Sequence, residues 1–420
     1  MGGWVELELA YGHKALPVRL PATRVQAVIE PVVTEGAASE ADLLTEALAH
    51  PLGTPPLRRV VRAGQKVVIV TSDLTRPCPS DRLLPPILDE LAAGGVADSD
   101  ITIVLALGLH RPMTQSEIET ALGSESARRL LALNHDPSDT VRLGVTSSGT
   151  PVELYRPVVE ADVRVCLANL ELHYFAGYSG GAKAILPGCA SRAAVNANHS
   201  MMVRAEAKAG RLDDNPVRAD LEEGAAMAGI DFILNVVVDG RHRIVGAVAG
   251  DAIAAHRRGC QMVAERSTVP INGRAGIVLV SAGGWPKDVN LYQAQKALDN
   301  AAYALRDRGI LILVAECPEG LGNRTFEHWL AGGSSPDQIL QRIQQEFVLG
   351  GHKAAAIAAV VKRAAVYLVS ALPEDLVRRC GMVPFATAGA ALEAALAAQG
   401  DSAGILVLPQ GGSVLPLAQA

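Results

Sequence analysis

Short apolar runs alternate with helix-like segments along most of the 420-residue chain, and this alternation limits the fold more than any other feature. KVVIVT (66–71), ITIVLALG (101–108) and VRVCLANL (163–170) have the length and composition of buried strands. Helix-like segments such as SDRLLPPILDELAAGG separate them. The alternation predicts an α/β fold with mainly parallel sheets and helices on both faces.

Two domains are predicted from the length and from one break in the pattern. A domain typically spans about 100–200 residues. TVPINGRAG (268–276) has the turn residues of a linker, and the alternation restarts directly after it. We therefore place an N-terminal α/β domain at 1–268 and a C-terminal α/β domain at 269–420. WVELELAYG and ALPVRLP, near the start, predict a β-hairpin.

The composition excludes several classes of partner. The net charge is −6 and no run of Lys or Arg is present, which argues against nucleic acid. The apolar runs are too short to span a bilayer, and the N-terminus does not have the pattern of a signal peptide, so we expect a cytoplasmic protein with no membrane partner. The six cysteines are scattered without a CxxC pair, which argues against a disulfide framework or a cysteine zinc site. No heptad pattern indicates an oligomeric state.

Polar or glycine-rich loops follow four of the predicted strands. These loops are TSDLTRPCPS, LHRPMT, ELHYFAGYSGGAK and GGWPKDVNLYQAQK. In open α/β sheets, ligands bind beyond the carboxyl ends of the strands. We therefore expect an active site where these loops meet, in a cleft between the two domains.

The loop HYFAGYSGGAK (173–183) has the most specific composition of the four. Gly180 and Gly181 allow a positive φ or a close approach of the backbone. A bound phosphate is the usual reason to bring backbone N–H groups that close. The loop is not a P-loop, because Lys183 follows Gly-Gly-Ala and is followed by Ala184 instead of Ser or Thr.

Two loop histidines are candidates for acid/base chemistry. His110 precedes a helix whose predicted capping box is Thr114 and Glu117, and His173 directly follows a strand. Each histidine alone is more typical of a loop residue bonded to a nearby carbonyl. Together, on opposite sides of one substrate, they would form a paired acid and base. His199 follows on a helix without an HExxH pattern, so a zinc site made by protein ligands alone is weakly supported.

Two further clusters indicate substrate binding. In DLTRP, Asp73 and Arg76 form either a structural ion pair or a site in which Arg76 clamps a carboxylate or phosphate. In LYQAQKALDN, helical spacing places Tyr292, Gln293 and Lys296 on one face. A solvated helix face is the alternative, and the position after a glycine-rich strand end favours binding.

The order of these motifs resembles that of the nickel-dependent lactate racemase family over nearly the whole chain. The resemblance implies a nickel-pincer nucleotide, a pyridinium mononucleotide whose two sulfur arms and one ring carbon bind nickel. It also implies racemisation or epimerisation of a short 2-hydroxy acid by removal and return of a hydride, since the α C–H is too weakly acidic for simple deprotonation. The resemblance rests on DLTRP, LGLHRPMT, LELHYFAGYSGGAKAILPG, NANHSMM, DDNPVRADLEE and GGWPKDVNLYQAQKALDNA.

The resemblance also implies residue roles. Lys183 would hold the cofactor through a thioamide bond, and His199 would be the one protein ligand in a planar nickel site with soft sulfur donors. His110 and His173 would be the acid/base pair, one for each enantiomer. Arg76 and Lys296 would bind the substrate carboxylate, with Tyr292 and Gln293 lining the site. The residues placed near the ribose and phosphate of the cofactor are Asp73, Thr75, Ser179, Gly180 and Gly181.

One departure from the family pattern bears on the substrate. Lactate-acting members carry a tryptophan where this chain has LGGHKAAAIA, with His352 and Lys353. A more basic pocket suits a second carboxylate, so malate is a candidate substrate beside lactate.

Two other functions remain alternatives. A nicotinamide-dependent 2-hydroxy acid dehydrogenase would also move a hydride, but no G-x-G-x-x-G fingerprint follows an early strand. A non-catalytic protein that binds a nucleotide cofactor would need the SGGAK loop but not both His110 and His173.

Overall fold

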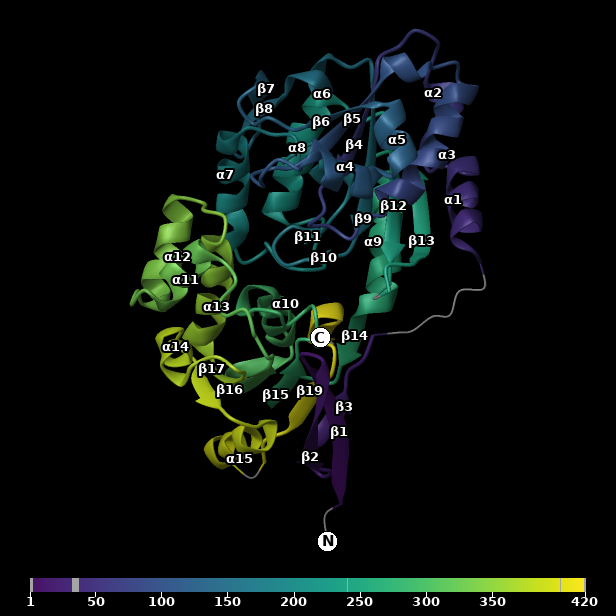
Figure 1. Ribbon diagram of the computed structural model, residues 1–420. Helices are drawn as coiled ribbons and strands as arrows, with labels where there is room; N and C mark the ends of the chain where they lie inside the picture. Colours follow the sequence, from purple (N-terminus) through teal and green to yellow (C-terminus); the bar gives the residue numbers. More distant parts are fainter. Residues whose placement is uncertain (1–2, 32–37, 240, 401, 419–420) are drawn as a thin grey trace. The chain divides into compact units, whose positions relative to one another are not determined.

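The computed structural model describes residues 3–31, 38–239, 241–400 and 402–418. The chain divides into two compact units (Figure 1). Unit 1 is formed by Met1–Val33 and Arg266–Ala420, and unit 2 by Thr34–Glu265. Each unit contains a six-stranded sheet flanked by helices, as the alternating pattern predicts. Within the described residues, no helix is both long and apolar enough to cross a membrane.

The sheet of unit 2 has the strand order β13-β12-β9-β4-β5-β6. All neighbouring pairs are parallel except β12 and β13, which are antiparallel. Because β9, β4 and β5 are adjacent and parallel, the loops that follow them leave from the same edge of the sheet. The strands are β4 (Val67–Ser72), β5 (Ile101–Ala106), β6 (Leu131–Asn134), β9 (Val163–Leu170), β12 (Phe232–Val238) and β13 (Ile244–Gly250).

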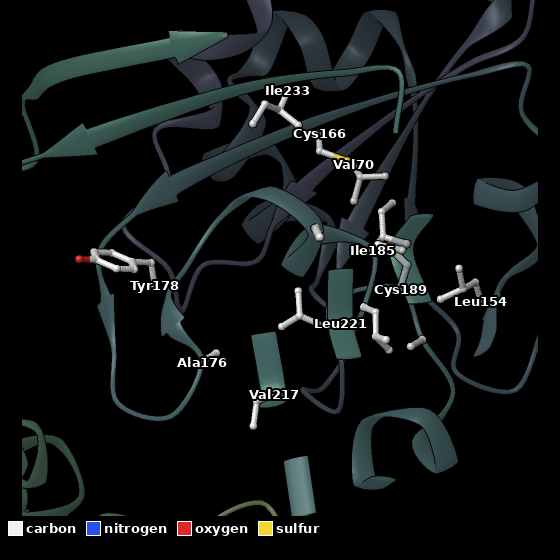
Figure 2. Close-up of a cluster of buried hydrophobic side chains, with 14 of the residues drawn as sticks. Val70, Leu154, Cys166, Ala176, Tyr178, Ile185, Cys189, Val217, Leu221 and Ile233 are labelled. Atoms are coloured by element: carbon white, nitrogen blue, oxygen red, sulfur yellow. The ribbon is translucent and has the colours of Figure 1, made fainter. Parts of the chain in front are cut away.

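Helices cover both faces of this sheet because successive strand residues point to opposite sides. In β4, Val67 and Ile69 join one buried cluster, and Val68 and Val70 join the other. Figure 2 shows part of the second cluster, which includes Leu221 of a helix and Val70 and Cys166 of strands. The helices of unit 2 are α1 (Glu40–Ala49), α2 (Leu57–Val60), α3 (Ser80–Ala93), α4 (Gln115–Leu122), α5 (Ser124–Arg129), α6 (Arg156–Glu160), α7 (Arg192–Ser200) and α8 (Pro216–Ala228), with α9 (Ala254–Ser267) at the unit boundary.

Short elements complete unit 2. The hairpin of β7 (Thr140–Val145) and β8 (Pro151–Tyr155) packs beside α7 and α8. β10 (Leu172–His173) and β11 (Gly177–Tyr178) form a small antiparallel pair within the glycine-rich loop. Single 3₁₀ turns are η1 (Asp98–Asp100), η2 (Gly181–Ala184) and η3 (Met201–Val203).

The sheet of unit 1 is parallel throughout, in the order β18-β17-β16-β15-β19-β3. Its strands are β3 (Val25–Val28), β15 (Ala275–Ser281), β16 (Leu305–Val314), β17 (Ala365–Val369), β18 (Val383–Phe385) and β19 (Ile405–Leu408). Its helices are α10 (Leu291–Ala301), α11 (Arg324–Ala331), α12 (Pro336–Gln345), α13 (Gly351–Arg363), α14 (Glu374–Arg379) and α15 (Ala388–Gln399), with the 3₁₀ turn η4 (Gly411–Ser413).

Two boundaries differ from the sequence prediction. The predicted hairpin of β1 (Trp4–Tyr11) and β2 (Lys14–Pro21) is present, but the first 33 residues belong to unit 1 and not to the predicted domain 1–268. The reason is that β3 extends the sheet of unit 1 beside β19. The predicted linker 268–276 begins with a strand, β14 (Thr268–Ile271), which pairs in parallel with β20 (Leu415–Ala418).

The buried His135 of unit 2 should make the protein less stable in mild acid. His135 is 2% exposed, and neither ring nitrogen has a hydrogen-bond partner among the described residues. Burial lowers the pKa of His135 from 6.5 to about 4, against a small opposing effect of Asp136. The unfolded chain therefore binds this proton more tightly, and stability falls as the pH drops from 6.5 towards 4.

We expect His135→Phe to remove this pH dependence. Between pH 7 and pH 4, wild type should lose about 3 kcal/mol of unfolding free energy more than the variant. Urea unfolding at both pH values measures the difference. His50→Gln, at an exposed histidine, is the control and should follow wild type. Equal losses in wild type and His135→Phe would contradict the assignment.

Candidate active site

Three of the four predicted loops lie at one edge of the unit 2 sheet. DLTRP follows β4, LGLHRP follows β5 and the glycine-rich loop follows β9. Because β4 lies between β9 and β5, His110 and His173 leave from strands on either side of the strand that leads to Asp73. The strand order therefore brings three of the four loops to one edge of the unit 2 sheet. The fourth loop follows β15 and belongs to unit 1.

Asp73 orients His110. The Nδ1 atom of His110 lies 2.5 Å from Oδ2 of Asp73, and Asp73 is 6% exposed. Thr75 donates its backbone N–H and its hydroxyl to the other carboxylate oxygen, at 3.0 and 2.6 Å. Burial by itself would raise the pKa of Asp73, but the hydrogen bonds from His110 and Thr75 outweigh it and lower that pKa. An ionised Asp73 accepts the Nδ1–H of His110, which gives the neutral ring a lone pair at Nε2.

His173 has the opposite hydrogen-bond pattern. Its Nδ1 accepts the backbone N–H of Ala176 at 3.3 Å, so the neutral ring carries its proton on Nε2. Nε2 lies 3.5 Å from Nζ of Lys183. Burial, followed by the nearby charges of Lys183 and Arg76, lowers the pKa of His173 well below its usual value. In this arrangement His173 is a neutral imidazole whose Nε2–H faces an amine.

The amine of Lys183 is shifted towards its neutral form. Burial is the main cause, and the charges of Arg218 and Arg76 add to it, so that the pKa of Lys183 lies well below its usual value. A neutral amine has a lone pair that can accept the Nε2–H of His173, which agrees with the hydrogen bond described above. It is also the nucleophilic form of lysine.

The two glycines are required by packing as well as by backbone conformation. Gly180 and Gly181 have φ values of 72° and 56°. A Cβ atom on Gly180 would lie 2.6 Å from a methyl group of Leu170, and one on Gly181 would lie 2.7 Å from the ring of His256. The N–H of Gly181 donates to Oδ1 of Asn235 at 2.8 Å. The N–H of Gly181 is therefore already bonded within the protein. Gly181 has a structural role at this position, in addition to the phosphate-binding role that the sequence indicated.

Ser179 is also engaged within the loop. Its hydroxyl donates to the carbonyl of Asn169 at 2.9 Å and accepts the backbone N–H of Glu171 at 2.8 Å. The carbonyl of Ser179 accepts Nε2–H of the buried His256 at 2.9 Å. These bonds tie the loop to the end of β9 and to α9.

Arg218 of α8 anchors the loop, a role that its sequence context does not indicate. Arg218 is fully buried, and its guanidinium donates to the backbone carbonyls of Ala176, at 3.2 Å, and Tyr178. Asn215, the N-cap of α8, donates to the carbonyl of Phe175 at 2.8 Å. Both residues lie in the motif DDNPVRADLEE, where an Asn-Pro pair signals a helix start but nothing signals the partners across the fold.

His199 lies near the end of α7, a helix whose N-cap is Ser191. The ring is 9% exposed and packs edge-on against Phe175, with 4.9 Å between centroids. Nδ1 lies 2.9 Å from Oδ1 of Asn198. Among the described residues, no group of three or more His, Cys, Asp or Glu side chains is arranged to hold a metal ion. Within the described part of the chain, His199 therefore belongs to no cluster of these side chains that would hold a metal by itself.

The predicted substrate residues of unit 1 begin α10. Asn290 caps this helix by accepting the N–H of Gln293 at 3.0 Å. Gln293 and Lys296 are exposed, and Tyr292 is partly buried. The buried Lys353 of α13 donates to the carbonyl of Tyr292 at 2.6 Å, and its Nζ lies 4.1 Å from the centre of the Tyr292 ring. The exposed Arg76 lies on the DLTRP loop of unit 2.

Comparison with known proteins finds relatives over almost the whole chain. The lactate racemase N-terminal domain family matches residues 11–210, and the lactate racemase C-terminal domain family matches residues 271–416. A lactate racemase from Thermoanaerobacterium thermosaccharolyticum is 34% identical over 421 residues, covering 97% of this chain and 98% of the relative. A lactate racemase from Lactiplantibacillus plantarum is 33% identical over 387 residues, covering 90% and 91%.

A solved structure extends this similarity to the fold. The apoprotein of the lactate racemase from Thermoanaerobacterium thermosaccharolyticum superposes with a TM-score of 0.90 at 34% sequence identity. The match covers 98% of this chain and 100% of that structure.

Proposed function

Because this chain belongs to the lactate racemase family, we propose that it racemises or epimerises a short 2-hydroxy acid with a nickel-pincer nucleotide. The observation that carries the proposal is the pair of imidazoles, His110 and His173, on loops that flank β4. The same edge of unit 2 holds Lys183, and the buried His199 packs against Phe175 of the same loop.

The residues present fit the proposed cofactor. His199 offers one imidazole, and no protein cluster completes a metal site among the described residues. This donor set suits a group that brings its other nickel ligands with it. The lowered pKa of Lys183 favours the neutral amine, which is the form that can make a thioamide bond. When bound, the nickel-pincer nucleotide supplies the acceptor and donor of hydride.

The two histidines move the hydroxyl proton of the substrate. His110 carries a lone pair on Nε2, because Nδ1–H is held by Asp73, and Asp73 stabilises the imidazolium that forms. Burial is the main cause of the low pKa of His173. A thioamide at Lys183 would remove the amine that faces Nε2 of His173 at 3.5 Å, which would leave that nitrogen for the hydroxyl of the substrate. Each histidine then serves one enantiomer.

For the residues first placed near the cofactor we propose new roles, and for the substrate-binding residues we keep the predicted ones. We propose that Asp73 and Thr75 orient His110, and that Ser179, Gly180 and Gly181 shape the loop that carries Lys183. This replaces direct contact with the ribose and phosphate as their main function. Arg76 of unit 2 and Lys296 of unit 1 remain the proposed carboxylate ligands, with Tyr292 and Gln293 as further substrate-binding residues.

Malate stands beside lactate as a candidate substrate. The supporting observation is the buried Lys353, whose cation lies against the ring of Tyr292. A cation at this position would favour a substrate with a second carboxylate. Racemisation of lactate with no activity on dicarboxylic 2-hydroxy acids would remove this preference.

The first test is the nickel content of the loaded protein. The chain is supplied with the nickel-pincer nucleotide, desalted and analysed for nickel, and D- and L-2-hydroxy acids are then assayed for racemisation. We expect wild type to retain nickel and His199→Ala to lose it, because this imidazole is the proposed protein donor. His50→Ala, at an exposed histidine, should retain nickel as wild type does.

Each other outcome selects another function. Failure of wild type to retain nickel would overturn the proposal. Net conversion to a 2-oxo acid with added NAD would indicate the dehydrogenase. Retained nickel without turnover of any 2-hydroxy acid would indicate a protein that only carries the cofactor.

A further inference from the structure

A chain of buried hydrogen bonds leads from the β7–β8 hairpin to His199. Thr150 donates its backbone N–H to the hydroxyl of Thr146 at 3.0 Å, and Thr146 in turn donates to Oδ1 of Asp220. The hydroxyl of Thr150 donates to Oδ2 of Asp220 at 2.8 Å. Both threonines and Asp220 are no more than 4% exposed. Asp220 is therefore an acceptor at both carboxylate oxygens.

Asp220 fixes the orientation of the Asn198 amide. Nδ2 of Asn198 donates to Oδ2 of Asp220 at 2.8 Å and to the carbonyl of Val217 at 3.1 Å. A flipped amide would place its oxygen against both of these acceptors, in a site where Asn198 is fully buried. Such a contact leaves buried acceptors without donors and is strongly unfavourable. The amide oxygen of Asn198 must therefore face His199.

The amide oxygen of Asn198 sets the tautomer of His199. Oδ1 of Asn198 has no proton to give, so Nδ1 of His199, 2.9 Å away, must be the donor. A neutral imidazole with a proton on Nδ1 carries its lone pair on Nε2. The elements involved, α7, α8, β7 and β8, pack together in unit 2 (Figure 1).

We propose that Asn198, held by Asp220, is a positioning residue that makes Nε2 the metal-binding nitrogen of His199. The inference rests on the proposed function, in which His199 is the nickel ligand. It adds a buried network that the sequence did not indicate, since Asn198 and Asp220 are separated by 22 residues. Partners of this kind fix the ring and strengthen metal binding in other histidine sites.

The test reads the tautomer directly in the cofactor-free protein. Two-bond ¹H–¹⁵N correlation spectra, at a pH where the ring is neutral, distinguish Nδ1–H from Nε2–H, and the signals missing in His199→Ala assign the residue. We expect Nδ1–H in wild type and a mixture of tautomers in Asn198→Leu. Thr150→Val, which removes one donor to Asp220 but keeps Asn198, is the matched control and should retain Nδ1–H. An Nε2–H tautomer of His199 in wild type would overturn the proposal. This outcome does not depend on whether any variant folds.

Cofactor titration separates this inference from the proposed function. Nickel retained per chain, measured across a titration with the nickel-pincer nucleotide, should show about 10- to 100-fold weaker binding in Asn198→Leu than in Thr150→Val. Equal binding in the two variants would overturn the positioning role. A third outcome is that neither wild type nor either variant retains nickel, while the tautomer of His199 still depends on Asn198. The proposed function then fails, and the assignment of the tautomer stands.

Discussion

We expect replacement of His110 or His173 by glutamine to lower racemisation by about 100- to 10,000-fold, the usual contribution of a positioned acid or base. Neither residue is the proposed nickel ligand, so both variants should retain nickel as wild type does. The loss follows from proton transfer alone, because glutamine keeps hydrogen-bonding atoms but does not accept a proton near neutral pH.

A single-turnover experiment distinguishes the two histidines. Each imidazole is proposed to take the hydroxyl proton from one enantiomer, so each variant should still form 2-oxo acid from the other. Chemical quenching with pure D- or L-substrate, followed by measurement of 2-oxo acid per chain, gives the four yields. His50→Gln is the control at an exposed histidine and should behave as wild type. Loss of the same enantiomer in both variants, or wild-type rates in either, would contradict the paired roles.

The placement of these histidines could be predicted because it follows from strand order. Apolar runs identified β4, β5 and β9, and parallel neighbours bring their carboxyl ends to one edge. The signal for the capping box of Thr114 and Glu117 also lies within neighbouring residues, and the structure confirms the box. The hairpin at the start of the chain was visible in its alternation.

The supports of the site could not be predicted, because they pair residues that are distant in sequence. Arg218 meets the carbonyl of Ala176 across 42 residues, and Gly181 meets Asn235 across 54. A polar residue on a helix looks the same in sequence whether it is solvated or buried against backbone carbonyls. For the same reason, the pairing of β3 with β19, near opposite ends of the chain, left no local signal.

Arg218→Met should destabilise unit 2 by about 3 kcal/mol, because the carbonyls of Ala176 and Tyr178 lose the bonds from a buried charged donor. The carbonyl of Ala176 still accepts the N–H of Tyr178 at 2.9 Å. The variant keeps the aliphatic part of the side chain but removes the bonds to Ala176 and Tyr178. The variant also removes the ion pair between Arg218 and Glu222, at 3.7 Å. Glu222 keeps a partner, since Arg257 binds both of its carboxylate oxygens, at 2.7 and 2.8 Å. The loss of stability therefore comes mainly from the loop carbonyls and less from an unpaired carboxylate at Glu222.

The loop itself provides the sharper measurement of this effect. Urea unfolding gives the change in stability, and amide hydrogen exchange over residues 173–183 shows whether the glycine-rich loop has loosened. Arg257→Met is the matched control, because it removes the ion pair with Glu222 and the 3.2 Å contact with Nδ1 of His256 but leaves the bonds from Arg218 to the loop. Such a pair contributes about 1 kcal/mol or less. Faster exchange in Arg218→Met than in Arg257→Met is expected, since of these two arginines Arg218 donates to the loop carbonyls of Ala176 and Tyr178. Equal exchange would mean that Arg218 contributes charge balance alone.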